Sequence, residues 1–453
     1  MGDPDAVFKA YDIRGIVPDQ FDVDLARAVG AAFVDFAGAS RIVMGRDMRA
    51  SGVELSRAFA EGATGRGIDV VDLGMTSTDE LYFASGLLDA PGAMFTASHN
   101  PAQYNGIKLC LSGARPVGEE SGLSEIKAAV AAVGGPPAGG DGAGTITERD
   151  VLDDYAVKVR SFVDVSSLSP LKVVADTANG MGGLVVPAVF EGLGFDLEIL
   201  FGELDGSFPN HPPDPIQREN LAALSRRILE TGADLGLAFD GDADRCFLVD
   251  DAGEAVSGST TTAMVAAAML DKYPGATILH NLICSKAVGE IITERGGTPQ
   301  VTRVGHSYIK AVMASTDAVF GGEHSGHYYF RDNYRADSGC IAALVVTELL
   351  SAAGRPLSEV RRDFERYADS GEINTVVSDP RSVIDEVASV YASRVPEAAQ
   401  SRMDGLTVDL GEWWFNLRPS NTEPLLRLNL EAADTEACAS RVDEVVGLIK
   451  ELS

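Results

Sequence analysis

Residues 233–251 read ADLGLAFDGDADRCFLVDD, in which two apolar runs flank a short acidic loop. Each apolar run has the length and composition of a buried β-strand, so the segment predicts a strand, a polar loop and a second strand. Similar runs rich in Val, Ile and Leu alternate with helical patterns along the chain, as at 41–44, 68–73 and 171–175. This alternation predicts an α/β protein.

The loop inside this segment carries Asp240, Asp242 and Asp244, followed by Arg245. Three carboxylates at alternate positions suit a hard divalent cation, because without one each would repel the others. An EF-hand loop is an alternative, but Arg245 replaces its required glycine, Asp251 replaces its bidentate glutamate, and strands rather than helices flank the loop. A solvated acidic turn is the remaining alternative.

The charge balance bounds the classes of function. The chain has 453 residues, with 37 Lys and Arg against 67 Asp and Glu, and a net charge of −30. This surplus argues against binding to nucleic acid or an anionic membrane, because lysine and arginine hold phosphate backbones. Two short segments are basic against this background, FKAYDIRG at 8–15 and GRDMR at 45–49.

Length and cysteine content point to a multidomain protein of a reducing compartment. The length predicts about three or four domains. The five cysteines are scattered and include no CxxC pair, so they suggest neither a disulfide framework nor a zinc site. The first residues lack a signal-peptide pattern, and no apolar run approaches a membrane span. We therefore expect a cytoplasmic protein, and nothing in the sequence indicates an obligate protein partner.

Residues 92–111, GAMFTASHNPAQYNGIKLCL, contain a second polar turn at the end of a short apolar strand. In α/β folds the reacting groups often lie at such strand ends. Ser98 is a candidate nucleophile, with His99 and Lys108 nearby in the sequence, and the alternative is an ordinary capping turn. No GxSxG elbow surrounds Ser98, so the pattern does not support a hydrolase triad.

Residues 318–329, AVFGGEHSGHYY, predict a third strand that enters a glycine-rich polar loop. The side chains of Glu323, His324, Ser325 and His327 alternate acceptors with donors. This alternation matches a sugar, whose hydroxyl groups each donate and accept hydrogen bonds. The histidines could equally bind a metal or satisfy loop carbonyls.

Residues 412–428, EWWFNLRPSNTEPLLRL, predict a strand, a loop and a further strand. The loop contains Arg418, Ser420, Asn421 and Thr422. A guanidinium group, two hydroxyls, a side-chain amide and turn amides together form a candidate phosphate site. The alternative is an ordinary hairpin loop with a surface arginine.

Together the four loops resemble those of the α-D-phosphohexomutase family, over essentially the whole chain. TASHNP, DGDADR, GEHSGH and RPSNTEP occur in the family's order at domain-sized intervals. The resemblance implies three similar α/β domains and a distinct α+β C-terminal domain around a central cleft, each contributing one loop.

We expect these domains to span residues 1–145, 146–254, 255–368 and 369–453. A glycine- and proline-rich connector at 133–145 marks the first boundary. Near the second, Ser259 is expected to cap an alanine-rich helix.

The resemblance also implies roles for single residues, with Ser98 at the position of the family's phosphoserine. The implied Mg²⁺ ligands are Ser98, Asp240, Asp242 and Asp244. The implied catalytic residues are Ser98, His99, Lys108, Arg245 and Arg14, with Lys108 in the position of a proton-transfer group. The implied substrate-binding residues are Tyr11, His306, Glu323, Ser325, His327, Arg418, Ser420, Asn421 and Thr422.

The implied reaction interconverts mannose 6-phosphate and mannose 1-phosphate through phospho-Ser98 and a hexose 1,6-bisphosphate, as part of GDP-mannose supply. The segment after the sugar loop looks most like that of bacterial phosphomannomutases, and His324 stands where phosphoglucosamine mutases usually have glutamine. Glucose phosphates are expected as further substrates. The alternatives are a phosphoglucomutase or phosphoglucosamine mutase on the same scaffold, or a metal- or carbohydrate-binding protein without catalytic turnover.

Overall fold

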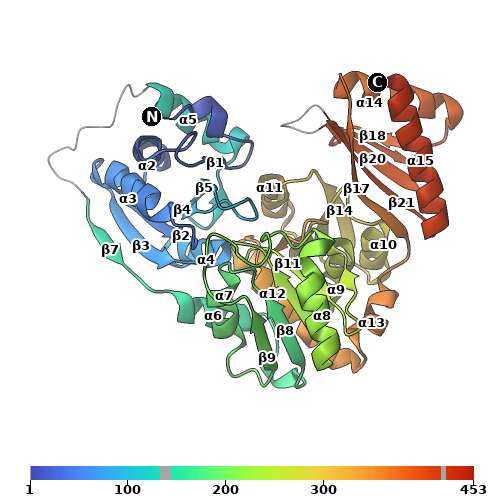
Figure 1. Cartoon of the computed structure of the whole chain (residues 1–453), viewed down its shortest axis with the longest axis horizontal. Coiled ribbons are helices and arrows are strands. Elements are labelled where there is room, and N and C mark those ends of the chain that lie inside the picture. The colour runs from blue at the N-terminus through green and yellow to red at the C-terminus, as the bar shows by residue number, and fades with distance from the viewer. Residues whose placement is uncertain (1, 133–143, 420–424) are drawn as a thin grey trace.

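The computed structural model describes residues 2–132, 144–419 and 425–453, whose strands form four β-sheets. Figure 1 shows the sheets following one another along the chain, with the first and last at the two ends of an arc. Helices and strands alternate through most of the chain, so the α/β prediction is confirmed. The connector expected at 133–145 lies almost wholly outside the described residues.

The first three sheets repeat one order of elements: strand, helix, strand, helix, strand, strand. The first unit contains β2 (Arg41–Arg46), α3 (Gly52–Thr64), β3 (Asp69–Met75), α4 (Thr78–Leu88), β4 (Gly92–Phe95) and β5 (Tyr104–Leu111). The second contains β8 (Lys172–Asp176), α7 (Gly182–Phe190), β9 (Asp196–Leu200), α8 (Ala222–Thr231), β10 (Leu235–Phe239) and β11 (Cys246–Val249). The third contains β13 (Thr277–Asn281), α10 (Lys286–Glu294), β14 (Thr298–Thr302), α11 (His306–Thr316), β15 (Phe320–Gly322) and β16 (Tyr328–Phe330).

The three units also share their strand pairing. The first strand of each unit lies between the second and third and is parallel to both. The fourth strand then returns antiparallel to the third. The spatial orders are β3-β2-β4-β5, β9-β8-β10-β11 and β14-β13-β15-β16. The structure thus shows that one arrangement of strands and helices occurs three times, although the sequence itself shows no repeat of fixed period.

Short strands extend the first two sheets. They are β1 (Ile13–Ile16), β6 (Arg115–Pro116) and β7 (Ile146–Glu148) in the first sheet and β12 (Ala255–Val256) in the second. Strand β7 pairs in parallel with β3, with Val70 opposite Ile146. The first sheet therefore continues to residue 148, past the boundary expected after residue 145. A three-residue edge strand is too short to show an apolar pattern.

Further helices cover these sheets, and polar side chains cap the start of four of the helices named here. They are α1 (Pro4–Val7), α2 (Val23–Ala37), α5 (Leu123–Ala132), α6 (Leu152–Arg160), α9 (Gly258–Lys272), α12 (Gly339–Ala353) and α13 (Leu357–Val360). Single 3₁₀ turns occupy Glu119–Ser121, Val165–Ser167, Arg218–Leu221, Arg331–Asn333 and Arg361–Asp363. Helix α9 is capped by Ser257, whose hydroxyl accepts a hydrogen bond from the Thr260 amide, so the expected cap at Ser259 is wrong.

The fourth sheet differs from the others, as expected. Its strands are β17 (Ala368–Val376), β18 (Ala399–Ser401), β19 (Leu406–Asp409), β20 (Trp414–Pro419) and β21 (Leu425–Ala432). Every neighbouring pair is antiparallel, and α14 (Pro380–Arg394) and α15 (Thr435–Leu452) pack against the sheet. The predicted architecture of three α/β units and a distinct C-terminal unit is confirmed.

The apolar cores separate the fourth unit from the other three but do not follow the units one by one. One large cluster joins the second and third units and also includes Met48, Phe83 and Ala84 of the first. The fourth unit has a separate core, which runs from Val377 to Ile449. Among the described residues, no single helix is long and apolar enough to cross a membrane. Two successive helical segments, Gly339–Ala353 and Leu357–Asp363, are long and apolar enough only when they are taken together, and the chain bends by 89° between them.

Candidate active site

The three polar loops of the first three units occupy the same place in the repeat, the turn between the third and fourth strands. The β4–β5 loop carries Ser98, the β10–β11 loop carries the three aspartates, and the β15–β16 loop carries Glu323 and His327. These loops meet in space. Ser98 Oγ donates a hydrogen bond of 2.7 Å to Asp240 Oδ2, and Arg245 pairs with His327 in an isolated backbone bridge.

Ser98 is held in a conformation that serine rarely adopts. Its φ of 47° lies in the left-handed region, where backbone strain is common at functional sites. The Ser98 amide donates a hydrogen bond of 2.8 Å to Thr96 Oγ1. Its hydroxyl also lies 3.3 Å from Nδ1 of His99. The predicted nucleophile therefore faces a carboxylate and an imidazole.

A buried arginine that the sequence did not single out supports this loop. Arg49 follows β2 and its side chain is 1% exposed. Its guanidinium donates hydrogen bonds to four carbonyl oxygens of the Ser98 loop, those of Ser98, Asn100, Pro101 and Tyr104. Asp47 accepts a further bond from Arg49 Nε at 3.1 Å. The basic segment at 45–49 was the available signal, and its role is to hold the loop.

The three aspartates form a compact cluster that fits a cation. Asp240, Asp242 and Asp244 are buried, and each offers a carboxylate oxygen within 4.8 Å of the others. Among the described residues, Oδ1 of Asp242 and Oδ1 of Asp244, which are both buried, have no hydrogen-bond partner. Unpaired buried carboxylate oxygens are costly, and an oxygen-binding divalent ion would satisfy them.

Two buried cations partly neutralise the cluster. Lys108 Nζ donates to Asp242 Oδ2 at 2.7 Å and to Asp244 Oδ2 at 2.6 Å. Arg245 Nε donates to Asp240 Oδ2 at 3.0 Å. Burial lowers the pKa of Lys108, but the two aspartates outweigh it and raise that pKa well above its usual value. Burial raises the pKa of Asp240 well above its usual value, and Arg245 only partly opposes this.

Glu323 and its neighbours in the third loop lie beside this cluster. Glu323 Oε2 accepts a hydrogen bond of 2.7 Å from the Tyr329 hydroxyl, and Oε1 accepts from Asn281 Nδ2 and the Gly305 amide. Ser325 Oγ lies 3.0 Å from His327 Nδ1. His327 Nε2 lies 3.7 Å from Asp244 Oδ1. The orientation of Glu323 is thus fixed by three donors.

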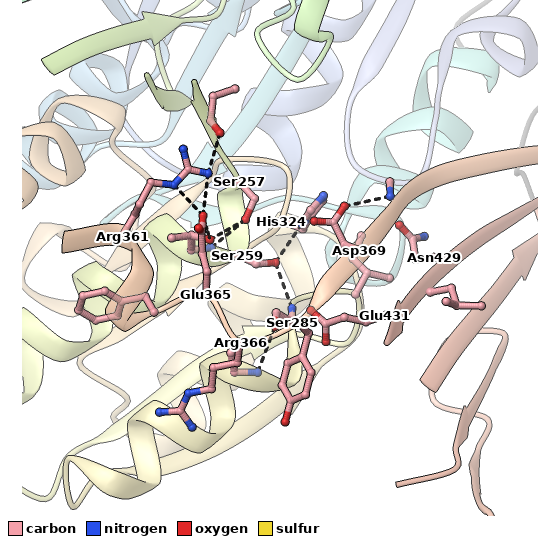
Figure 2. A pocket seen from close by; sticks show the side chains of 18 of the residues that line it. Ser257, Ser259, Ser285, His324, Arg361, Glu365, Arg366, Asp369, Asn429 and Glu431 are labelled. Atoms are coloured by element: carbon pink, nitrogen blue, oxygen red, sulfur yellow. Dashed lines mark hydrogen bonds and ion pairs between the residues drawn. The ribbon is translucent and has the colours of Figure 1, made fainter. Parts of the chain in front are cut away.

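His324 lies elsewhere, in a cavity of about 230 Å³ between the third and fourth units. Figure 2 shows it beside Ser259, whose hydroxyl is 2.9 Å from His324 Nδ1, with Ser285 and Asp369 nearby. Neither Ser98 nor the aspartate cluster lines this cavity. We therefore place the chemistry at the Ser98–Asp240 contact and not in this cavity.

The N-terminal basic segment reaches the Ser98 loop and the turn that precedes α11. Arg14 Nη1 donates to Asn100 Oδ1 at 2.6 Å, and Nη2 pairs with Asp12. The Tyr11 hydroxyl donates to the Val304 carbonyl at 3.3 Å, and its ring lies edge-on to His306 at 5.5 Å. Burial raises the pKa of Tyr11 to about 12. Nδ1 of His306 is buried and has no hydrogen-bond partner in the part of the chain that the structure describes.

Arg418 belongs to the fourth unit, at the end of β20. Its guanidinium lies 3.5 Å from Glu372 Oε2 and 4.0 Å from Asp404 Oδ2. Its Nε is buried and has no hydrogen-bond partner within residues 2–132, 144–419 and 425–453, and burial lowers its pKa. The other predicted residues of this loop, Ser420, Asn421 and Thr422, lie outside the described residues. The structure places Arg418 on a different unit from the Ser98 cluster.

Comparisons with known proteins match the division of the chain into four units. Family models match four parts of the chain. They are phosphoglucomutase/phosphomannomutase alpha/beta/alpha domain I at 5–134, domain II at 153–253, domain III at 257–367 and the C-terminal domain at 372–448.

Curated relatives and a solved structure match over nearly the whole chain. A protein named Phosphohexose mutases from Xanthomonas campestris pv. campestris (strain B100) is 40% identical over 446 residues, covering 98% of this chain and 99% of that protein. The Phosphomannomutase of Escherichia coli (strain K12) is 38% identical over 452 residues, covering 98% and 99%. The crystal structure of a phosphoglucomutase/phosphomannomutase family protein from Burkholderia thailandensis has a TM-score of 0.89 at 32% identity, covering 100% and 98%. The chain belongs to the phosphoglucomutase/phosphomannomutase family.

Proposed function

We propose that the protein is a phosphomannomutase that interconverts mannose 6-phosphate and mannose 1-phosphate. The observation that carries this proposal is the 2.7 Å hydrogen bond from Ser98 Oγ to Asp240. It joins a serine with a strained backbone to a cluster of three carboxylates that could hold a cation. The relatives named phosphomannomutase favour mannose phosphates as substrates. Glucose phosphates are proposed as further substrates, and the cytoplasm as the compartment, since all five cysteines are free and buried.

The cluster would hold Mg²⁺ through Asp240, Asp242 and Asp244, with phosphorylated Ser98 as the fourth ligand. When bound, this ion would supply positive charge to a transferring phosphoryl group. Lys108 and Arg245 add two fixed cations at the same place. Phosphoryl transfer needs positioning and charge neutralisation above all, and these side chains are already held in place by buried ion pairs.

In the proposed cycle, Ser98 carries the phosphoryl group at the start. The free hydroxyl of a hexose monophosphate loses its proton and forms a new O–P bond, while the Ser98 Oγ–P bond breaks and Oγ takes up a proton. The product is a hexose 1,6-bisphosphate, whose other phosphoryl group then returns to Ser98 by the reverse exchange. His99 Nδ1, 3.3 Å from Oγ, is placed to pass protons to and from the serine. Lys108, which the family resemblance assigns to proton transfer, is bonded to two carboxylates.

The remaining site residues would hold the substrate. Glu323, Ser325 and His327 would read the sugar hydroxyls, because their fixed acceptors and donors lie next to Asp244. Arg14, Tyr11 and His306 would line the approach to Ser98. The grip on the phosphate that does not react would come from Arg418, together with Ser420, Asn421 and Thr422.

A substrate panel tests this function. Purified protein with Mg²⁺ and a hexose 1,6-bisphosphate is assayed with mannose, glucose and glucosamine phosphates, and kcat/KM is compared. We expect mannose phosphates to rank first, and a preference for glucosamine 1-phosphate would reassign the enzyme. Intact-mass measurement should show a fraction about 80 Da heavier, with the phosphoryl group on Ser98. If the protein shows no phosphorylation and no turnover, the result would instead support a metal- or carbohydrate-binding protein.

A further inference from the structure

Thr78 in the first unit contacts the metal loop of the second unit twice. Its Oγ1 donates a hydrogen bond of 2.6 Å to Asp242 Oδ2, and its backbone amide donates one of 3.1 Å to the Asp242 carbonyl. Thr78 is fully buried. It is the first residue of α4, whose N-cap is the preceding Ser77, so helix capping does not use the Thr78 hydroxyl.

These contacts decide which oxygen of Asp242 is left for a cation. Oδ2 accepts from both Thr78 Oγ1 and Lys108 Nζ, whereas Oδ1 is buried and has no hydrogen-bond partner within the described ranges of the chain. A carboxylate held by two donors on one oxygen keeps a fixed rotation about its side chain. The second oxygen is therefore presented in one orientation, which is how hydrogen bonds behind a metal ligand usually act.

The next residue, Asp79, anchors Thr78 to the rest of the molecule. Asp79 Oδ2 accepts from the hydroxyl of Tyr155 in α6 and, at 2.8 Å, from Ser338 Oγ, the N-cap of α12. Asp79 and Ser338 are fully buried and Tyr155 is nearly so. The start of α4 is thus tied to the second and third units, and it cannot shift without breaking these bonds.

We propose that Thr78 is a positioning residue for the divalent cation, fixing Asp242 so that its free oxygen is preorganised for the metal. This inference rests on the proposed metal role of the aspartate cluster. It predicts that the Thr78 hydroxyl controls metal affinity, with little effect on the affinity for the sugar phosphate itself. If Thr78 served only packing, its replacement would not lower the affinity for the metal while leaving the affinity for the sugar phosphate unchanged.

The experiment measures metal binding directly. Mn²⁺ affinity is determined by electron paramagnetic resonance of the free ion, with Mg²⁺ as competitor, for wild type, Thr78→Val and Thr78→Ser. We expect Thr78→Val to weaken the affinity by about 10- to 100-fold and Thr78→Ser to restore it to near the wild-type value. Binding of mannose 1-phosphate to metal-free protein, followed by calorimetry, should stay within about twofold. Thr347→Val is the matched control, because Thr347 is fully buried and its hydroxyl donates to the Leu344 carbonyl within α12, away from the aspartate cluster.

The outcomes separate this inference from the proposed function. If wild type binds Mn²⁺ and Thr78→Val binds it equally well, the positioning role is refuted while the proposed function stands. If wild type binds no divalent ion, the metal role fails and this inference fails with it. Equal losses of metal and sugar-phosphate affinity in Thr78→Val would show general damage and also count against the role. Should the valine variant not fold, Thr78→Ala, which removes the same hydroxyl from a smaller side chain, gives the same comparison.

Discussion

Arg49 Nη2 lies 2.9 Å from the carbonyl oxygen of Ser98, so a buried guanidinium fixes the backbone of the residue that we propose as the phosphoryl carrier. The same group binds three further carbonyls of that loop. A lysine offers one compact ammonium and cannot reproduce such a planar set of donors.

Arg49→Lys should therefore lower kcat by roughly 100-fold, because a small displacement of a reacting group costs about that much. Its Mn²⁺ affinity should change less than kcat, since Arg49 donates no hydrogen bond to the other three proposed ligands, Asp240, Asp242 and Asp244, among the described contacts. Steady-state kinetics and Mn²⁺ titration check both statements. Arg57→Lys is the control, since that side chain is 81% exposed and should behave like wild type. A fully active Arg49→Lys protein would contradict the positioning of Ser98 by Arg49.

Asp242→Asn should reduce kcat/KM on the order of 100- to 1,000-fold, because it removes one charge from the proposed cation site. The fold should persist, since Asp242 contributes charge and not apolar packing, and circular dichroism checks this. Wild-type activity should be lost in EDTA and restored by Mg²⁺. The exposed Asp19 provides a control, and Asp19→Asn should leave both activity and EDTA sensitivity unchanged. Wild-type activity that persists in EDTA would contradict the metal role.

Gly241→Ala should prevent the close contact between the Ser98 loop and the loop that carries the three aspartates. A Cβ atom at position 241 would lie 2.4 Å from the Ser98 carbonyl oxygen, so one of the two loops would have to move. We expect a large loss of kcat together with weaker Mn²⁺ binding. Gly447→Ala in α15 is the matched control, because a Cβ there meets open space and alanine favours a helix by roughly 0.5–1 kcal/mol. Normal activity in Gly241→Ala would show that the loops need not approach so closely.

Glu80 gives a prediction for the pH dependence of stability. Burial raises the pKa of Glu80 in the folded protein to about 7, from its usual 4.5. The folded state thus holds a proton that the unfolded state has lost between these values, so this group makes stability fall as pH rises from about 4.5 to 7.

Glu80→Gln should remove that slope and become more stable than wild type above pH 7, by about 1–3 kcal/mol. A glutamine oxygen can still accept the capping hydrogen bond from the Ser77 amide. Urea unfolding of both proteins at pH 5, 6, 7 and 8 measures the difference. Glu54→Gln, an exposed position in the first turn of α3, should keep the wild-type slope. A difference between wild type and Glu80→Gln that is the same at every pH would contradict the prediction.

The parts of the site that lie in one short segment could be predicted from the sequence. Asp240, Asp242 and Asp244 share a loop between two apolar strands, and Ser98 follows a strand in the same way. Their local pattern alone indicates a turn at a strand end. The structure then adds that the two loops touch, which no local pattern contains.

Residues that act between units could not be predicted in this way. Thr78 begins a helix of the first unit, and its contact with Asp242 spans 164 positions of the chain. The Arg49 side chain is buried among carbonyls, whereas the sequence marked it only as part of a short basic segment. The choice between Ser257 and Ser259 as the N-cap of α9 could not be predicted either. Both are good capping residues two positions apart, and tertiary packing decides between them.

The common strand order of the first three units has a consequence for how such an enzyme arises. If one ancestral unit was copied twice, each copy kept its backbone while the hairpin between its last two strands was free to diverge. One hairpin now carries Ser98, the second carries the acidic cluster and the third carries Glu323, which we propose reads the sugar. Specialisation of this kind leaves the sheets intact, so the position of a functional segment in each copy follows from topology before its residues are inspected.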